Sequence, residues 1–231
     1  MKFLPKVQAA SGAVFAFFLV LHLATTASAA TGIAGFDNTL ITLRSVYRPN
    51  IAVELILIGV PLAVHAVCAL VQMGRRFKTR PNPKPHWHIR VHRWTGYYLL
   101  VVIIGHVFAT RIMPLFGAGP TATGSADFSY LAYSLVHWPA FFYPYYILLG
   151  FCGAVHMCLG VGIAARVLTP KLAAKLPVQK ISTALAAVCG VIAVIGVLFI
   201  LSNAWHADRS RFAEYDAVYD KFMPFMKPLN H

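Results

Sequence analysis

Histidines inside apolar stretches are the residues of this chain that could do chemistry. The sequence has ten histidines, and His22, His65, His106 and His156 lie deep in four different apolar segments. Imidazole is the commonest metal ligand among side chains and also exchanges protons near neutral pH. A single histidine in a membrane helix is most simply an interhelical hydrogen-bond partner. Whether these four share a ligand depends on where their segments place them.

Five long apolar segments must position these histidines. The composition is 58% hydrophobic and 12% charged, with a mean hydropathy of +0.66, which indicates a membrane protein. A helix needs about 20 apolar residues to cross a bilayer, and the segments that qualify are about 7–27, 51–73, 95–114, 140–165 and 181–203. The lipid core offers no hydrogen-bond partner to the backbone, and a helix pairs its own backbone groups. We therefore expect an all-α fold. The prediction is a polytopic helical bundle with five transmembrane helices, forming a single membrane domain over residues 1–231.

Lysine and arginine positions predict how the bundle is oriented. Basic residues without acidic companions lie in residues 1–6, 75–93 and 166–180. Alternating spans place these three regions on one side, which the positive-inside rule makes the inside. We therefore expect the N-terminus inside and the C-terminus outside, in a bacterial cytoplasmic membrane or the mitochondrial inner membrane. The net charge of +13 is confined to these loops, which argues against nucleic-acid binding.

The first segment also has the features of a cleavable signal peptide. Lys2 and Lys6 precede an apolar run that ends near Ala27-Ser28-Ala29, a small-residue pattern typical of a cleavage site. Its removal would break the alternation of charge and discard His22. We therefore expect residues 7–27 to be retained as a transmembrane helix.

Depth in the membrane groups the four histidines into two pairs. At a helical rise of about 1.5 Å per residue, His65 and His156 both lie about 12–14 Å below the inner surface, and His22 and His106 both lie about 8–12 Å from the outer surface. Two imidazoles at one depth on different helices can bind a haem iron from opposite faces. A zinc ion would need about three or four converging ligands. The sequence therefore predicts two b-type haems, each with one histidine pair on its iron.

Cysteines and glycines in the spans bear on how such haems would be held. The four cysteines form no haem-attachment motif, so the haems would be bound non-covalently. Small residues in the spans leave room for a macrocycle or for close helix packing: Gly12, Gly96, Gly105, Gly150, Gly153, Gly160 and Gly162.

Four runs of sequence are similar to a known family. They are SGAVFAFFLVLHL (11–23), VELILIGVPLAVHA (53–66), TGYYLLVVIIGHVFATRIMP (95–114) and FCGAVHMCLGVG (151–162). In helix number, order and histidine placement they resemble the di-haem cytochrome b membrane anchors of succinate:quinone oxidoreductases and fumarate reductases (respiratory complex II). The resemblance implies that His65 and His156 bind the proximal haem, next to an iron–sulphur subunit, and that His22 and His106 bind the distal one.

The resemblance also implies a function and partners. Electrons would pass between an iron–sulphur subunit and membrane quinone, in a complex that includes a flavoprotein subunit. The chain itself has no flavin or iron–sulphur motif, so it would not be catalytic alone. Some fumarate reductase anchors carry a glutamate before the fourth ligand, where this chain has Ala154 and Val155, so that proton route is not expected here.

A second family keeps an alternative function open. The same runs resemble the membrane domain of a fungal mitochondrial adaptor family that is related to these cytochromes. The alternative is therefore a non-respiratory membrane adaptor, with or without haem.

Further polar residues are candidates for contacts with haem or quinone. Glu54 begins the second span at the outer surface, where it could exchange a proton with quinone or simply interact with the helix dipole. Arg111 could pair with a haem propionate or snorkel to the interface. Ser11, His92 and Arg93 lie near the inner surface and are candidates for the proximal haem edge or an inner quinone site.

Two regions outside the spans have a predicted role. The proline-interrupted segment 81–88 is expected to form an irregular inner loop that contacts anionic lipid or docks a hydrophilic partner. In the tail, residues 207–231, apolar residues at helical spacing predict a helix along the outer membrane interface: Phe212, Tyr215, Val218, Tyr219 and Phe222.

Overall fold

A computed structural model describes residues 3–78, 85–116 and 127–225, and every regular element in these ranges is helical. Five continuous helical stretches are long and apolar enough to cross a membrane: Phe3–Thr31, Ile51–Lys78, Trp87–Phe116, Pro139–Leu168 and Val178–Ala204. The prediction of an all-α chain with five such helices is therefore confirmed.

Each stretch extends beyond the predicted apolar segment. The third stretch begins at Trp87 rather than at residue 95, because polar residues such as His88 and Arg90 continue the helix without being apolar. Hydropathy marks where a segment can meet lipid, whereas backbone hydrogen bonds mark where the helix begins. Segment 81–88 falls partly outside the described residues, and its described part enters this helix.

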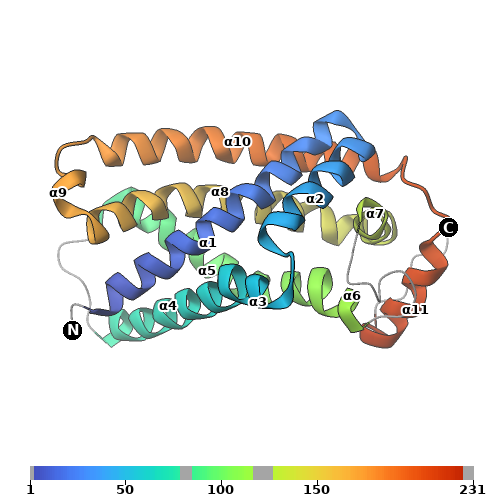
Figure 1. Cartoon of the computed structure of the whole chain (residues 1–231), viewed down its shortest axis with the longest axis horizontal. Coiled ribbons are helices and arrows are strands. Elements are labelled where there is room, and N and C mark those ends of the chain that lie inside the picture. The colour runs from blue at the N-terminus through green and yellow to red at the C-terminus, as the bar shows by residue number, and fades with distance from the viewer. Residues whose placement is uncertain (1–2, 79–84, 117–126, 226–231) are drawn as a thin grey trace.

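The long helices form one bundle around a shared interior (Figure 1). Its members are α1 (Phe3–Ser28), α4 (Val60–Lys78), α5 (Trp87–Val107), α8 (Pro139–Leu168) and α10 (Val178–Ala204). Helix α1 crosses the bundle diagonally and packs against α4, α8 and α10, and α5 packs against α8. Helix α10 lies along α8 on one side of the bundle. The four histidine-bearing helices are thus neighbours.

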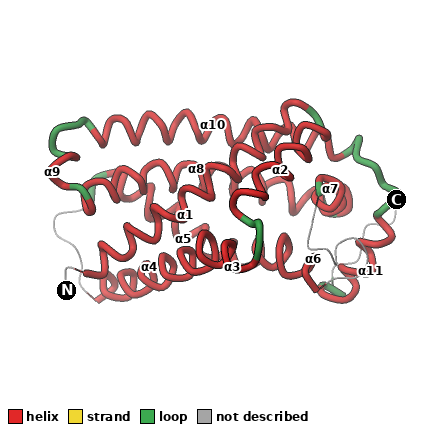
Figure 2. The backbone as a smooth tube through the Cα atoms, in the orientation of Figure 1, coloured by secondary structure: helices red, strands yellow, loops and turns green. Residues whose placement is uncertain are grey.

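Short helices gather at one end of the bundle (Figure 2). They are α2 (Ile33–Tyr47), α7 (Phe128–His137) and α11 (Phe212–Phe222), and we call this the capped end. At the other end lie the start of α1, the end of α4, the start of α5 and the short α9 (Pro170–Ala173). Described parts of all three basic regions lie there, so we call it the basic end. Helices α2 and α7 were not predicted from the sequence because, at 15 and 10 residues, they are too short to stand out as spans.

The tail helix packs against protein at the capped end. Tyr215 and Tyr219 of α11 are buried against Met113, Tyr130 and Tyr133. This aromatic face is covered by α6 (Met113–Phe116) and α7 and so packs on protein. The position of the tail along the outer membrane interface stays a prediction.

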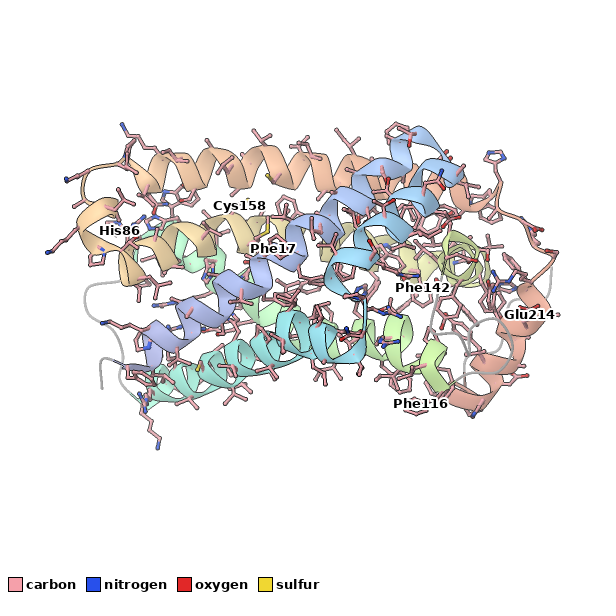
Figure 3. All side chains as sticks on the ribbon, viewed as in Figure 1. Phe17, His86, Phe116, Phe142, Cys158 and Glu214 are labelled. Carbon is pink, nitrogen blue, oxygen red and sulfur yellow. The ribbon has the colours of Figure 1, made fainter. Side chains whose placement is uncertain are left out.

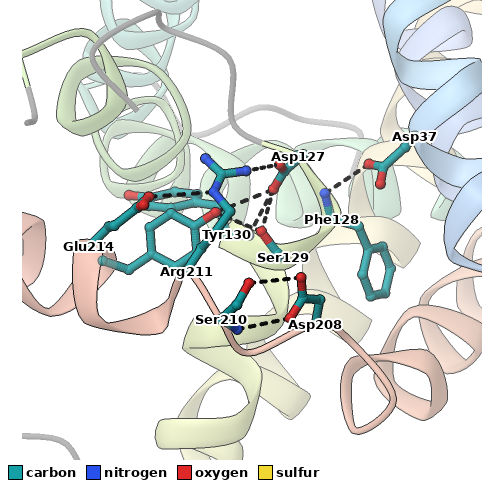
Figure 4. A network of polar contacts seen from close by, with 10 residues as sticks. Asp37, Asp127, Phe128, Ser129, Tyr130, Asp208, Ser210, Arg211 and Glu214 are labelled. Carbon is teal, nitrogen blue, oxygen red and sulfur yellow. Dashed lines mark hydrogen bonds and ion pairs between the residues drawn. The ribbon is translucent and has the colours of Figure 1, made fainter. Parts of the chain in front are cut away.

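A polar network holds α11 in place (Figure 4). The guanidinium of Arg211 forms an ion pair with Asp127, which also accepts a hydrogen bond from Tyr130 N at the start of α7. The hydroxyl of Ser129 lies 2.6 Å from that of Tyr215. The network ties the tail to the start of α7 through groups that the sequence separates by more than eighty residues.

Two π-helical turns interrupt the second and third stretches near the capped end. The first, Leu55–Gly59, precedes Pro61, and the second, Phe108–Ile112, precedes Pro114. A proline has no N–H to donate within the helix and its ring crowds the preceding turn. The wider π turn accommodates this, and its extra residue rotates the flanking side chains by about 100°. Each proline thus follows closely on a π turn and not on a regular α-helical turn.

Candidate functional site

The four intramembrane histidines lie in two pairs. The ring centroids of His22 and His106 are 5.9 Å apart, with an angle of 68° between the ring planes. Those of His65 and His156 are 6.1 Å apart, with an angle of 87°. The first pair joins α1 to α5 toward the capped end, and the second joins α4 to α8 toward the basic end. These are the same two pairs that the predicted depths group together.

The spacing of each pair suits two axial ligands on one metal. A metal–imidazole bond of about 2.0–2.1 Å, with about 1.1 Å from the nitrogen to the ring centre, places two such centroids about 6.2 Å apart. Packed aromatic rings span about 4.5–7 Å, so distance alone does not separate the two cases. The surroundings of the rings do.

All four histidines line one elongated cavity of about 890 Å³, near the upper end of the range of ligand sites, about 300–1,000 Å³. Its walls are mainly apolar, with residues such as Leu19, Leu62 and Ile103 between the two pairs. In Figure 3, the label of His86 marks the basic end of the molecule and the label of Glu214 marks its capped end. A long apolar chamber with two imidazole pairs fits large, flat, apolar ligands.

Backbone carbonyl groups anchor the rings of the basic-end pair. His65 Nδ1 lies 3.0 Å from the carbonyl oxygen of Gln8, and His156 Nδ1 lies 3.0 Å from that of His92. A carbonyl can only accept, so each Nδ1 carries the proton and donates it. The Nε2 lone pair of each ring is then free for a metal, which is the usual arrangement for metal-bound histidine.

Two buried polar atoms on the cavity wall have no hydrogen-bond partner within the described ranges: His106 Nδ1 and Arg93 Nε. An unsatisfied buried polar group costs about 1–3 kcal/mol, and a haem propionate in the cavity would supply the acceptor that Arg93 Nε lacks. No cluster of three or more histidine, cysteine or acidic side chains suited to a metal ion occurs in the part of the chain that the structure describes. The two imidazole pairs are of the kind that fits haem, which brings its own equatorial nitrogens and needs two from the protein.

Arginines line the cavity at both ends. Arg76, Arg93 and Arg166 lie at the basic end, and Arg44, Arg48 and Arg111 at the capped end. A haem carries two propionates, and guanidinium groups bind carboxylates through paired hydrogen bonds.

At the capped end these cations exceed the acids. Burial lowers the pKa of Arg44, and burial together with the nearby charge of Arg111 lowers that of Arg48. Within the described residues, Glu54 and Asp127 are the carboxylates of the cavity wall, and Asp127 pairs with Arg211. An anionic ligand group would relieve this excess.

Arg111 and Glu54 bind each other. Arg111 donates from Nε and from one terminal nitrogen to the two carboxylate oxygens of Glu54, each at 2.6 Å, and Arg48 lies 3.7 Å from the same carboxylate. The sequence predicts separate roles for them, with quinone for Glu54 and a propionate for Arg111. The structure makes them one unit on the cavity wall, with Glu54 directly before the first π turn and Arg111 within the second.

The remaining candidates differ in their access to the cavity. His92 lines it, and its ring stacks on that of His156 with centroids 4.1 Å apart and planes 13° from parallel. Arg93 also lines it. Ser11 is not part of the lining, because its hydroxyl turns back to donate to the carbonyl oxygens of Val7 and Gln8. A contact of Ser11 with a haem edge stays a prediction.

Sequence reasoning missed a spacing shared by two helices. Ser11-Gly12 precedes His22 in α1 as Thr95-Gly96 precedes His106 in α5, with nine residues between each glycine and histidine. Each glycine lies against the ring of a histidine from the neighbouring helix, Gly12 against His65 and Gly96 against His156. The repeated Ser/Thr-Gly-x9-His pattern is the signal that could have identified them.

Comparison of the chain with protein-family models, with curated proteins and with solved structures finds no match in any of the three.

Proposed function

We propose that this protein is a membrane-anchor cytochrome b subunit that holds two b-type haems and passes electrons between an iron–sulphur partner and membrane quinone. The observation that carries the proposal is a close pair of imidazoles from two different helices at each of two levels of one cavity, with ring centroids 5.9 Å apart for His22 and His106 and 6.1 Å apart for His65 and His156. When bound, haem supplies an iron that exchanges one electron at a time.

The protein's own contribution is to bind, orient and insulate. The histidines provide axial nitrogens, and the carbonyl groups of Gln8 and His92 hold two of these rings in the tautomer that leaves Nε2 free. Arginines at each end of the cavity would pair with propionates. The apolar wall excludes water, and ligand type, hydrogen bonding and burial are the means by which a protein sets a haem potential.

The two levels lie along the direction in which electrons would have to travel. Gly12, which contacts His65, and His22 are ten residues apart on α1, which is about 15 Å along the helix axis. The chain would thus hold one haem near each end of the bundle.

The proposal includes an orientation and a partner surface. The described basic end carries nine lysines and arginines within residues 75–93 and 166–180 and no acidic residue: Arg75, Arg76, Lys78, Arg90, Arg93, Arg166, Lys171, Lys175 and Lys180. We assign this end to the inside, toward the iron–sulphur subunit of a succinate dehydrogenase or fumarate reductase complex with its flavoprotein. The host membrane would be the bacterial cytoplasmic or mitochondrial inner membrane. Quinone at the capped end would meet Glu54 and Arg111 as a pair.

Purification in a mild detergent from the native membrane tests the proposal. The expected result is two extractable haems b per chain, recovered together with flavin-containing and iron–sulphur subunits. A matched preparation of a His22→Ala/His65→Ala variant, which lacks one ligand of each pair, controls for haem that binds non-specifically. A wild-type protein that is isolated alone and without haem would overturn the proposal in favour of the adaptor function.

A further inference from the structure

We propose that Gly12 and Gly96 are positioning residues that, with the carbonyl groups of Gln8 and His92, clamp the imidazoles of His65 and His156 in the orientation needed for axial ligation. The inference rests on the proposed function, because it makes the clamped rings haem ligands. It assigns a role to two glycines and two main-chain carbonyl groups on α1 and α5, whereas the two clamped rings belong to α4 and α8.

Close approach is the first part of the clamp. A Cβ atom at position 12 would lie 2.7 Å from Nδ1 and 2.9 Å from Cε1 of His65. A Cβ atom at position 96 would lie 2.7 Å from Cε1 and 3.2 Å from Nδ1 of His156. Real Cβ contacts essentially never fall below 3.0 Å. Only glycine therefore allows either ring to lie where it does.

A hydrogen bond is the second part. The accepting carbonyl belongs to the residue four positions before the glycine in both helices, Gln8 before Gly12 and His92 before Gly96. Positions four apart lie on one face of a helix, about one turn from each other. Each ring can therefore rest on the glycine and donate its Nδ1 proton to the carbonyl on the same face.

The hydroxyls beside the glycines complete the correspondence. Ser11 donates to the carbonyls of Val7 and Gln8, and Thr95 donates to those of Val91 and His92. Each hydroxyl thus bonds to the carbonyl oxygen that also accepts the histidine proton. The contacts that α1 makes to the α4 histidine are therefore the same as those that α5 makes to the α8 histidine. Because the arrangement occurs twice, an accidental contact at one glycine does not explain it.

The clamp is confined to the basic-end pair. His106 Nδ1 is buried without a partner among the described residues, whereas the Nδ1 atoms of His65 and His156 both have a carbonyl acceptor. In this arrangement the planes of the two clamped rings make an angle of 87° with each other. For a low-spin iron, the angle between the axial ring planes decides how the two π-bonding d orbitals split, so a displaced ring changes the electron paramagnetic resonance (EPR) signal of that iron.

Alanine substitutions with matched controls test the clamp. Gly12→Ala and Gly96→Ala place a methyl group against His65 and His156, whereas Gly74→Ala and Gly105→Ala place one in open space at exposed positions of α4 and α5 outside the cavity lining. We expect both clamp variants to shift or lose the same low-spin EPR component, the one that His65→Ala also removes, with up to half of the haem lost. The other component should stay, which shows that the bundle is folded. Both control variants should keep both components at wild-type intensity.

Unchanged spectra in both clamp variants would overturn the inference, as would an equal loss in the two controls. A variant that accumulates poorly is tested in a His65→Ala background, where the ring that Gly12→Ala would strike is gone. There Gly12→Ala should lower the unfolding midpoint no further, and an undiminished additional loss would count against the clamp.

Failure of the proposed function has a different outcome. A wild-type protein without haem would overturn the cytochrome assignment, and nitrogen-15 spectra of the histidine rings would then report on the clamp alone. The clamp predicts neutral His65 and His156 with the proton on Nδ1, and a changed tautomer ratio for His65 in Gly12→Ala. An Nε2-protonated His65 in the wild type would rule the clamp out without reference to haem.

Discussion

Arg111 grips the carboxylate of Glu54 through two hydrogen bonds of 2.6 Å, joining the second and third membrane-spanning stretches at the capped end. The side chains are 20% and 12% exposed, so water screens the pair only partly. Exposed ion pairs contribute about 0–1 kcal/mol, whereas a bidentate arginine–carboxylate contact is stronger. Glu54 is therefore held in an ionic contact and is not a free acid at the membrane surface.

Replacing Arg111 by leucine should destabilise the bundle by about 1–3 kcal/mol, because a partly buried carboxylate loses its two direct donors. The free energy of unfolding, measured by detergent titration and circular dichroism, reports this loss. Glu54→Leu/Arg111→Leu should recover part of it, since neither charge is then left without the other. Additive effects of the two single substitutions would show that the contact contributes nothing.

Single histidine substitutions should fall into two spectral classes. His65→Ala and His156→Ala should each abolish one haem, and His22→Ala and His106→Ala the other, because an iron that loses an axial ligand loses affinity and its low-spin state. Each variant should keep about half of the haem, and the double variant within a pair should keep as much as either single. Haem content and reduced-minus-oxidised absorption spectra measure this. A shared residual spectrum for the His22 and His65 variants would contradict the two levels.

Asp127 should make the attachment of α11 sensitive to acid. Burial opposes its ionisation, but the hydrogen bond from Ser129 and the charge of Arg211 outweigh burial and lower its pKa. A carboxyl whose pKa is lower in the folded state stabilises that state above its unfolded pKa, about 3.9, and the stabilisation is lost as the pH falls from there through the lowered value. Hydrogen exchange of α11 amides should therefore accelerate in this window.

Asp127→Asn separates charge from helix capping. Asparagine can still cap α7 but forms no ion pair with Arg211, so α11 should exchange faster at neutral pH and lose its acid response. Asp37→Asn is the matched control. Burial raises the pKa of Asp37, so its ionisation at neutral pH opposes folding, and its replacement should leave the acid response intact. An unchanged profile for Asp127→Asn would place the acid sensitivity elsewhere.

The first helix should be present in the working protein. Helix α1 packs against α4, α8 and α10, and a Cβ atom on Gly196 of α10 would lie 2.9 Å from the carbonyl oxygen of Thr26. We expect the intact mass of the purified protein to include residues 3–28. A start at about Ala30, where a signal peptidase would cut, would remove His22, Gln8 and Gly12 together. Such a protein should then bind neither haem in the proposed manner.

The sequence by itself determined the number of membrane-length apolar helices and predicted a depth for each histidine. Both are one-dimensional quantities: a bilayer demands a set length of apolar chain, and a helix rises by a constant amount per residue. His22 and His106 could thus be assigned to one level, and His65 and His156 to another, without knowing which helices touch. Rotation about a helix axis and the choice of neighbours were beyond such reasoning, because they follow from packing between residues far apart in the chain. The tertiary structure alone decided that His65 rests on Gly12 and that Arg111 pairs with Glu54. It also decided that the aromatic face of α11 packs on α7, since an amphipathic helix has the same pattern whether protein or lipid covers it.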